Sequence, residues 1–194
     1  MKTNLLPAIK LTLLCIALFV VVYSTFIWSV AFMVAPNHGR GEVVLNDKGK
    51  LVGFAIVGQN FNQDKYFWSR PSAVNYNAAG SGGSNKGPTN QEYLKTVQAR
   101  IDTFLVHNPG IVKSQIPVEL VTASGSGLDP NISPAAATIQ IARISKIRKI
   151  DQEKIKQLID KNIQQPLLGI FGPPKVNVLK LNIDLDKIES KINK

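Results

Sequence analysis

Residues 11–35 read LTLLCIALFVVVYSTFIWSVAFMVA, a run of 25 residues without a charged side chain. A helix rises about 1.5 Å per residue, so this run would extend over roughly 37 Å, more than the ~30 Å hydrocarbon core of a bilayer. A cleaved signal peptide is the alternative, because Ser29-Val30-Ala31 has the small-x-small form of a cleavage site. Signal cores are usually about 7–15 residues long, so we expect a retained transmembrane helix.

Charges around this run predict its orientation. Lys2 and Lys10 precede it, and basic residues favour the cytoplasmic side. We expect residues 1–10 to form a cytoplasmic tail and residues 36–194 an extracytoplasmic domain, held at the inner (plasma) membrane. The 21 basic and 13 acidic residues after position 35 give that part +8, but long domains cross membranes largely regardless of charge. The lipid bilayer is then a partner, and nucleic acid is excluded.

Polar side chains interrupt the middle of the apolar run. Ser24 and Thr25 can bond back to carbonyls of their own helix, but the Tyr23 phenol cannot easily do so. We therefore expect Tyr23 to contact a membrane helix of another chain.

The remaining residues predict one domain of mixed helices and strands, an α/β or α+β fold. Apolar stretches at 42–45 and 51–57 flank a turn-forming insert and predict a β-hairpin. The spacing of Leu94, Val97, Ile101, Phe104 and Leu105 predicts a helix over residues 91–108, with Thr89 or Asn90 as its N-cap.

The C-terminal half continues this pattern. Ser133 followed by Pro134 predicts a capped helix with Ile139, Ile141, Ile144 and Ile147 facing inward. A further helix is expected to start at Asp151, with Ile155, Leu158, Ile159 and Ile163 facing inward. A strand over residues 176–182 and a short helix over residues 184–194 follow. Asp184 and Asp186 are interpreted as acidic residues that favour the start of that last helix.

Catalytic constellations lack essential parts in this sequence. His38 and His107 are the two histidines, and the single Cys15 lies in the membrane run, so Ser-His-Asp, Cys-His and multi-His metal arrangements are excluded. We assign no catalytic, cofactor-binding or metal-binding residue. The basic run at 143–161 is interpreted as a solvated face, with contact to anionic headgroups as the alternative.

Three features between residues 59 and 134 are candidates for binding. Residues 59–90 predict a long loop with aromatic side chains, and loops of this kind usually carry function. Its Gly/Ser-rich end at 79–90 and a second such loop at 123–134 could bond each other or a partner. Tyr66, Phe67 and Trp68 form an aromatic triplet within the long loop. Adjacent side chains of an extended segment alternate faces, so at least one member of this triplet is expected to meet another surface. The candidate partner-contact residues are Tyr23, Tyr66, Phe67, Trp68, Ser81, Ser84, Ser124 and Ser126.

Five runs in this order resemble the C subunit of the Kdp-type potassium-transporting ATPase. They are YFWSRPS (66–72), SGGSN with GPTN (81–85 and 87–90), LVTASGSGLDP (120–130), ISPAAA (132–137) and VNVL (176–179). Asn131 stands where the family often has His, and Lys86 where it often has an apolar residue, so neither receives a chemical role.

The resemblance implies a non-catalytic accessory subunit of an ATP-driven potassium uptake complex. Its partners would be a potassium-channel-like subunit, an ATP-hydrolysing subunit and a small membrane subunit, and the complex rather than this chain would handle ATP and potassium. The family is described as a catalytic chaperone that raises the ATP affinity of the ATP-hydrolysing subunit. A free-standing, membrane-anchored envelope binding module is the alternative, and a hydrolase using Ser126 and Asp129 ranks third because it lacks a base.

Overall fold

The computed structural model describes residues 4–46 and 48–192. The chain divides into two compact units, residues 1–43 and residues 44–194. The start of the predicted cytoplasmic tail, Asp47 of the predicted turn and the last two residues of the predicted final helix lie outside the described residues.

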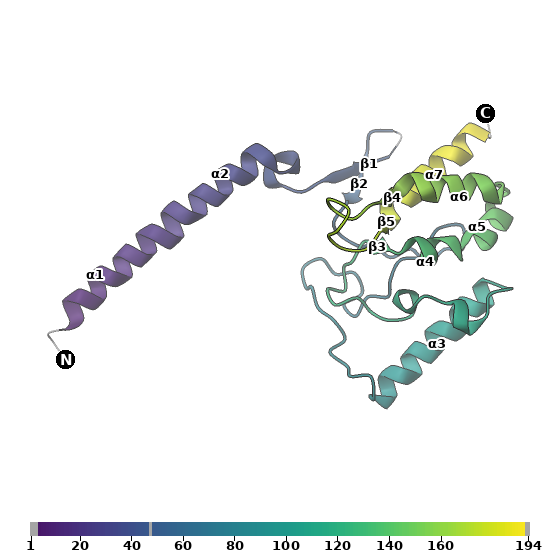
Figure 1. Ribbon diagram of the computed structural model, residues 1–194, viewed down its shortest axis with the longest axis horizontal. Helices are drawn as coiled ribbons and strands as arrows, with labels where there is room; N and C mark the ends of the chain where they lie inside the picture. Colours follow the sequence, from purple (N-terminus) through teal and green to yellow (C-terminus); the bar gives the residue numbers. More distant parts are fainter. Residues whose placement is uncertain (1–3, 47, 193–194) are drawn as a thin grey trace. The chain divides into compact units, whose positions relative to one another are not determined.

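The first unit is one long apolar helix. It comprises α1 (Leu5–Cys15), a π-helical stretch (Ile16–Tyr23) and α2 (Ser24–Val34), drawn in purple and blue in Figure 1. Together they make the 30-residue helix Leu5–Val34, which is long and apolar enough to cross a membrane by length and composition. Ala35 is extended because helical angles are disfavoured before a proline, and a 3₁₀ turn, Pro36–Gly39, follows.

The predicted hairpin is confirmed. Strands β1 (Val43–Leu45) and β2 (Leu51–Phe54) form a two-stranded sheet. The side-chain oxygen of Asn46 accepts hydrogen bonds from the backbone N–H groups of Lys48 (3.0 Å) and Lys50 (2.9 Å), which orders the turn between the strands.

A second, three-stranded sheet joins distant parts of the chain. Its central strand β5 (Lys175–Asn177) pairs antiparallel with both β3 (Asn131–Ile132) and β4 (Ile163–Gln164). Val176 is opposite Ile132 on one side and Ile163 on the other, and it is fully buried. The mixture of small sheets and helices confirms the predicted fold class.

Helices α4 (Pro134–Thr138) and α6 (Gln152–Asn162) pack against β5, and α5 (Ile141–Arg148) packs against α6. The predicted single helix after Ser133 is in fact two helices. The Gln140 side chain donates to the Ala136 carbonyl (3.0 Å), which is the acceptor that its own backbone N–H would use in a continuous helix. Ser133 caps α4 as predicted, and Asp151, the predicted start of a helix, is the N-cap of α6.

The last helix begins earlier than the sequence pattern indicates. The strand predicted over residues 176–182 ends at Asn177, and α7 (Val178–Ile192) starts directly after it. Asn177 caps this helix, because its side-chain oxygen accepts from the Lys180 N–H at 3.1 Å. Asp184 and Asp186 therefore lie in the middle of the helix rather than at its start, which corrects their interpretation.

The hydrophobic core gathers side chains from the loop, α3, α5, α6, α7 and β5. Helix α6 contributes Ile155, Leu158 and Ile159, all predicted to face inward, and α7 contributes three residues at helical spacing, Val178, Leu181 and Leu185. Ile147, also predicted to face inward, is 45% exposed. The largest fully buried apolar side chains are Phe67, Phe104, Ile144, Ile155, Ile159, Leu181, Leu185, Val176 and Val178.

Helix α3 (Gln91–His107) is predicted correctly but packs less than expected. Asn90 caps it by accepting from the Tyr93 N–H at 2.9 Å. Phe104 is buried, whereas Leu94 is 42% exposed. In Figure 1 the helix stands apart from α4–α7, and loops containing two 3₁₀ turns, Lys113–Gln115 and Val118–Leu120, run between them.

Candidate functional site

The aromatic triplet lies in residues 64–72, which form neither helix nor strand. Phe67 is fully buried in the core, while Tyr66 and Trp68 on either side are half-buried. The alternation of faces is therefore as predicted. Phe67 has no exposed surface, so this candidate contact residue serves the interior of its own chain.

Buried amide side chains satisfy the backbone of this segment. Asn182 on α7 accepts from the Phe67 N–H (2.8 Å) and donates to the Phe67 carbonyl (3.0 Å). Gln140 accepts from the Trp68 N–H at 2.8 Å. Both amides are essentially inaccessible to solvent, and they supply the pairing that a neighbouring strand would otherwise provide.

Two buried arginines stack on the flanking aromatic rings. The Arg143 guanidinium lies 4.5 Å from the Trp68 ring centre and donates to the Asp64 carbonyl (3.1 Å), to Asn108 (3.1 Å) and to Gln140 (2.6 Å). Burial of the guanidinium lowers the pKa of Arg143 to about 10, and the Asp64 carboxylate opposes this. Arg143 thus joins α5 to the aromatic segment through both charge and stacking.

Arg148 makes the equivalent contact on the other side of Phe67. Its guanidinium lies 4.8 Å from the Tyr66 ring centre, donates to the Lys65 carbonyl at 2.6 Å and pairs with Asp186 at 2.7 Å. The Tyr66 hydroxyl donates to Asp186 at 3.1 Å, and burial raises the pKa of Tyr66 with help from that carboxylate. The interpretation of residues 143–161 as a solvated face is therefore wrong for Arg143 and Arg148, because both are buried.

The two Gly/Ser-rich loops bond each other. The Ser126 carbonyl accepts from the Gly82 N–H (2.8 Å) and from the Ser81 hydroxyl (3.0 Å). Gly127 has φ +67°, and a Cβ there would lie 2.7 Å from the Gly82 carbonyl oxygen, so this approach requires glycine. Mutual bonding, one of the two alternatives for these loops, is thus present.

The second loop is also tied to the aromatic segment. The Ser124 N–H donates to the Pro71 carbonyl at 3.2 Å, and Arg70 pairs with Asp129 at 2.8 Å. Ser124 is buried, Ser84 is half-buried, and the serines that bond across the loops, 81 and 126, are exposed. Residues 64–72 are consequently held by α5, α7 and a loop at once.

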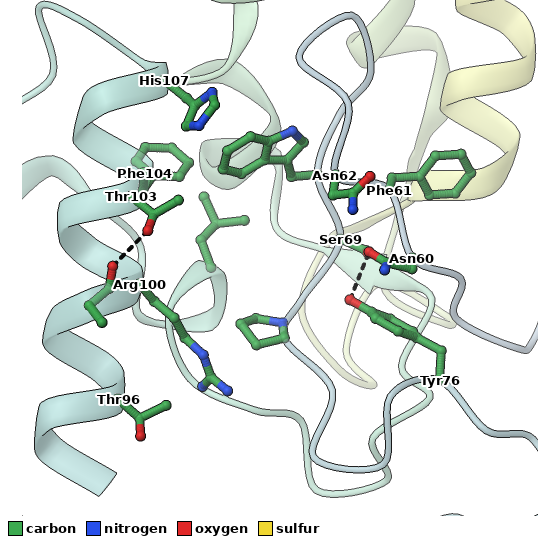
Figure 2. Close-up of a pocket in the computed structure, with 14 residues that line it drawn as sticks. Asn60, Phe61, Asn62, Ser69, Tyr76, Thr96, Arg100, Thr103, Phe104 and His107 are labelled. Carbon is green, nitrogen blue, oxygen red and sulfur yellow. Dashed lines mark hydrogen bonds between the residues drawn. The ribbon is translucent and has the colours of Figure 1, made fainter. Parts of the chain in front are cut away.

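An open pocket of about 440 Å³ separates this segment from α3. Figure 2 shows Arg100, Thr103 and His107 of α3 on one side, and Tyr76 bonded to Ser69 on the other. The lining mixes aromatic rings with one cation and several hydrogen-bonding groups. Its residues are Asn60, Phe61, Asn62, Trp68, Ser69, Pro71, Tyr76, Thr96, Ala99, Arg100, Thr103, Phe104, His107 and Leu120.

Side chains suited to metal binding are not grouped together. Within residues 4–46 and 48–192, no three His, Cys, Asp or Glu residues lie close enough to hold a metal ion. What the region offers is hydrogen bonding and stacking.

The apolar helix carries the remaining candidate. Tyr23 is 59% exposed on it, while the Ser24 hydroxyl bonds back to the Phe19 carbonyl at 3.1 Å as expected. Contact of Tyr23, Tyr66, Trp68 and the exposed serines with a partner stays a prediction.

Residues with the largest structural role here were not singled out from the sequence. Each of them makes a hydrogen bond to a residue of the aromatic segment that lies 70 or more positions away in the chain. They are Asn182, Gln140, Arg143 and Arg148. One signal was available for Asn182: it lies four residues after Val178 and three before Leu185, on the face of α7 that is otherwise apolar. A polar residue there must find a buried partner.

Comparisons with known proteins find relatives that match nearly the whole chain. The family model described as "K+-transporting ATPase, c chain" (KdpC) matches residues 5–187. Proteins named potassium-transporting ATPase KdpC subunit are similar over nearly their whole length. That of Bacteroides fragilis is 51% identical (98% of this chain, 100% of the relative). That of Flavobacterium johnsoniae is 52% identical (96% and 99%), and that of Bacillus thuringiensis is 40% identical (96% and 97%).

The matched residues include the apolar helix, the aromatic segment, both Gly/Ser-rich loops and most of α7. The chain therefore belongs to the KdpC family of potassium-transporting ATPase subunits.

Proposed function

We propose that this chain is a non-catalytic accessory subunit of an ATP-driven, high-affinity potassium uptake complex. It supports assembly of the complex and acts as a catalytic chaperone that raises the ATP affinity of the ATP-hydrolysing subunit. The observation that carries this proposal is the family match over residues 5–187, together with relatives that align over nearly their entire length.

The proposed partners are a potassium-channel-like subunit, the ATP-hydrolysing subunit and a small membrane subunit. Residues 1–10 are proposed to be cytoplasmic, residues 11–35 to span the inner (plasma) membrane and residues 36–194 to lie outside. The length and composition of the helix Leu5–Val34 support the span. ATP is then on the other side of the membrane, so the effect on its binding must pass through the membrane subunits as a coupling free energy.

The rigidity of the aromatic segment supports such coupling. Coupling between distant sites is carried by packed side chains, hydrogen-bond networks and rigid elements. Residues 64–72 are held by hydrogen bonds from Gln140 and from Asn182 on α7, and by two stacked arginines on α5. Tyr66 and Trp68 keep part of their rings accessible, and they remain the proposed contacts of this segment.

The test is to purify the complex with and without this chain and to measure ATPase activity against ATP concentration. Removal of the chain should raise the KM for ATP, while a complex reconstituted with it should recover the low KM. An unchanged KM would contradict the chaperone role. Phosphatase fused after the C-terminal lysine should be active only if that end is exported, so an inactive fusion would contradict the topology.

The pocket beside α3 favours the alternative of a free-standing envelope binding module. Its volume of about 440 Å³ suits a small molecule. Extraction in mild detergent separates the two functions. Stoichiometric co-purification with large membrane subunits supports the accessory subunit, whereas recovery of the chain alone supports the module.

A further inference from the structure

Arg100 on α3 presents a guanidinium that has no carboxylate partner among the side chains the structure describes. It donates one hydrogen bond, to the Val121 carbonyl at 3.1 Å. The ion pairs of the described side chains do not include it, whereas Arg143 and Arg148 each face a carboxylate. Arg100 is half-buried. A charge that is partly removed from water attracts a counter-ion more strongly than a fully solvated one, so this guanidinium is a binding group for an anion.

This guanidinium lines the pocket of about 440 Å³ between α3 and residues 64–72. Figure 2 shows Arg100 extending from the helix into the space between the two walls, with Tyr76 on the opposite side. Burial raises the pKa of Tyr76, and the positive charge of Arg100, after the hydrogen bond with Ser69, opposes that rise. The field of the guanidinium therefore extends across the pocket. The residues that line the pocket include no Asp or Glu, so an entering anion meets an attractive charge and no carboxylate.

The apolar part of the pocket lies one helical turn from this charge. Phe104 follows Arg100 by four residues, so the two side chains leave the same face of α3 about 6 Å apart. The Trp68 ring lies against Phe104, with 6.1 Å between ring centres, and its half-buried side chain lines the pocket. Pro71 and Leu120 add further apolar surface. The lining thus suits a ligand with a charge at one end and a flat apolar group at the other.

Other classes of ligand match these residues less well. A phosphate or sulfate site normally collects several cations or backbone N–H groups, and Arg100 is the one Lys or Arg among the residues that line the pocket. A divalent cation would need carboxylates, and a cation of any charge would be repelled by the guanidinium. A carboxylate, in contrast, matches the two-pronged geometry of a single guanidinium.

We propose that this pocket binds a small aromatic monocarboxylate, with the carboxylate on Arg100 and the ring against Trp68. The binding goes beyond the accessory role proposed above and does not depend on it, because all of the binding residues belong to this chain. Phenylacetate is a simple probe for the site, since a single methylene joins its ring to its carboxylate.

The first experiment measures phenylacetate binding by tryptophan fluorescence. The chain has two tryptophans, Trp28 and Trp68, so Trp28→Phe in the full chain in detergent leaves Trp68 as the reporter. Phenylacetate should change this fluorescence saturably, with a Kd of about 1 mM or lower. Phenylacetamide keeps the ring but carries no charge, and acetate lacks the ring, so each should bind at least about 10-fold more weakly. The absence of a saturable change, or equal binding of either control compound, would overturn the proposal.

The second experiment assigns the ligand to this pocket in the same Trp28→Phe chain. Arg100→Gln removes the charge and should weaken phenylacetate binding by about 10-fold or more. Lys95→Gln is the matched control, because Lys95 is exposed on the same helix and outside the pocket lining, and it should leave the Kd unchanged. An unchanged Kd in Arg100→Gln, or equal weakening in Lys95→Gln, would overturn the proposal.

A third variant keeps the test valid if the loss of the bond to Val121 unfolds Arg100→Gln. Ala99→Phe places a ring in the pocket from an exposed position of α3 and leaves Arg100 in place. It should abolish phenylacetate binding by filling the site, and full binding would overturn the proposal. All of these measurements use the chain alone, so their failure would leave the accessory role standing, whereas failure to co-purify with any membrane subunit would count against that role only.

Discussion

Residues 64–72 and residues 166–172 are both loops with several large apolar side chains, but they use them in opposite ways. The first has no regular structure, yet Phe67 is fully buried and its backbone is paired by Asn182. The second forms a hydrogen-bonded turn of its own, yet its large side chains are 61–81% exposed. Regular hydrogen bonding within a loop therefore does not indicate whether its large side chains are buried in the core.

The difference lies in where each backbone finds its hydrogen bonds. A segment paired by buried side chains from other elements is drawn into the core together with its own side chains. A turn that satisfies its backbone locally needs nothing from the core, so its side chains are left to solvent or to a partner. Two phenylalanines, one in each loop, allow this comparison to be tested.

Truncation of Phe67 should have the largest effect. Phe67→Ala leaves a cavity in a fully packed core and should lower the free energy of unfolding by about 3–5 kcal/mol. Phe171→Ala, the matched control, should change it by less than about 0.5 kcal/mol, because that ring is 61% exposed. Urea unfolding of the full chain in detergent measures both. Similar losses for the two variants would break the comparison.

Arg143 should be the next most sensitive position. Arg143→Lys keeps the positive charge but cannot reproduce the bonds to Asp64, Asn108 and Gln140 together with stacking on Trp68. We expect a loss of about 2–3 kcal/mol, since the remaining buried groups lose their partner. Lys146→Arg, at an exposed position of the same helix, is the control and should be neutral. A neutral Arg143→Lys would show that the arginine does not hold the segment.

The elements predicted well from the sequence are those set by local chemistry. The helix after Asn90, the helix start at Ser133 and the helix after Asp151 follow from N-caps and periodic apolar residues. The hairpin follows from the turn residues around Asn46. Each of these signals lies within a few residues of the structure it determines.

The errors have two origins, a local helix cap that the alternating pattern hides and pairing across long stretches of chain. The alternation V-N-V-L over residues 176–179 suits a strand, and the capping bond from Asn177 decides for a helix. Arg143 and Arg148 have the composition of a surface, but the aromatic segment lies about 80 residues before them and provides their buried partners. The exposed turn is visible in the sequence as the apolar run LLGIF (167–171) between Pro166 and Pro173. Its exposure to solvent, however, can be assigned only once the fold is known.

Tyr76 gives a pH-dependent test of the contacts that hold residues 64–72. Its hydroxyl donates to the Arg70 carbonyl at 2.6 Å, and burial raises the pKa of Tyr76 above its ordinary 10.0, with Ser69 and Arg100 opposing. The folded state holds the neutral phenol more firmly than the unfolded state does. This contribution to stability is fully present below pH 10 and is lost as pH rises through the higher folded pKa.

Tyr76→Phe should therefore lower the free energy of unfolding by about 1–2 kcal/mol at pH 7, because a carbonyl loses its donor. It should also reduce the further decline of the free energy of unfolding as pH rises above 10. Urea unfolding at a series of pH values measures both effects. A decline as steep in the variant as in the unchanged chain would contradict the assignment to Tyr76.

Leu168→Asn should have the smallest effect on stability, and of the opposite sign. Asn tolerates the left-handed backbone that Leu168 occupies at φ +55°, so the substitution should raise the free energy of unfolding by up to about 1 kcal/mol. Leu167→Asn is the control, because Leu167 is equally outward-facing but has no positive φ, and it should be neutral. Equal effects for the two variants would show that backbone strain is not the cause.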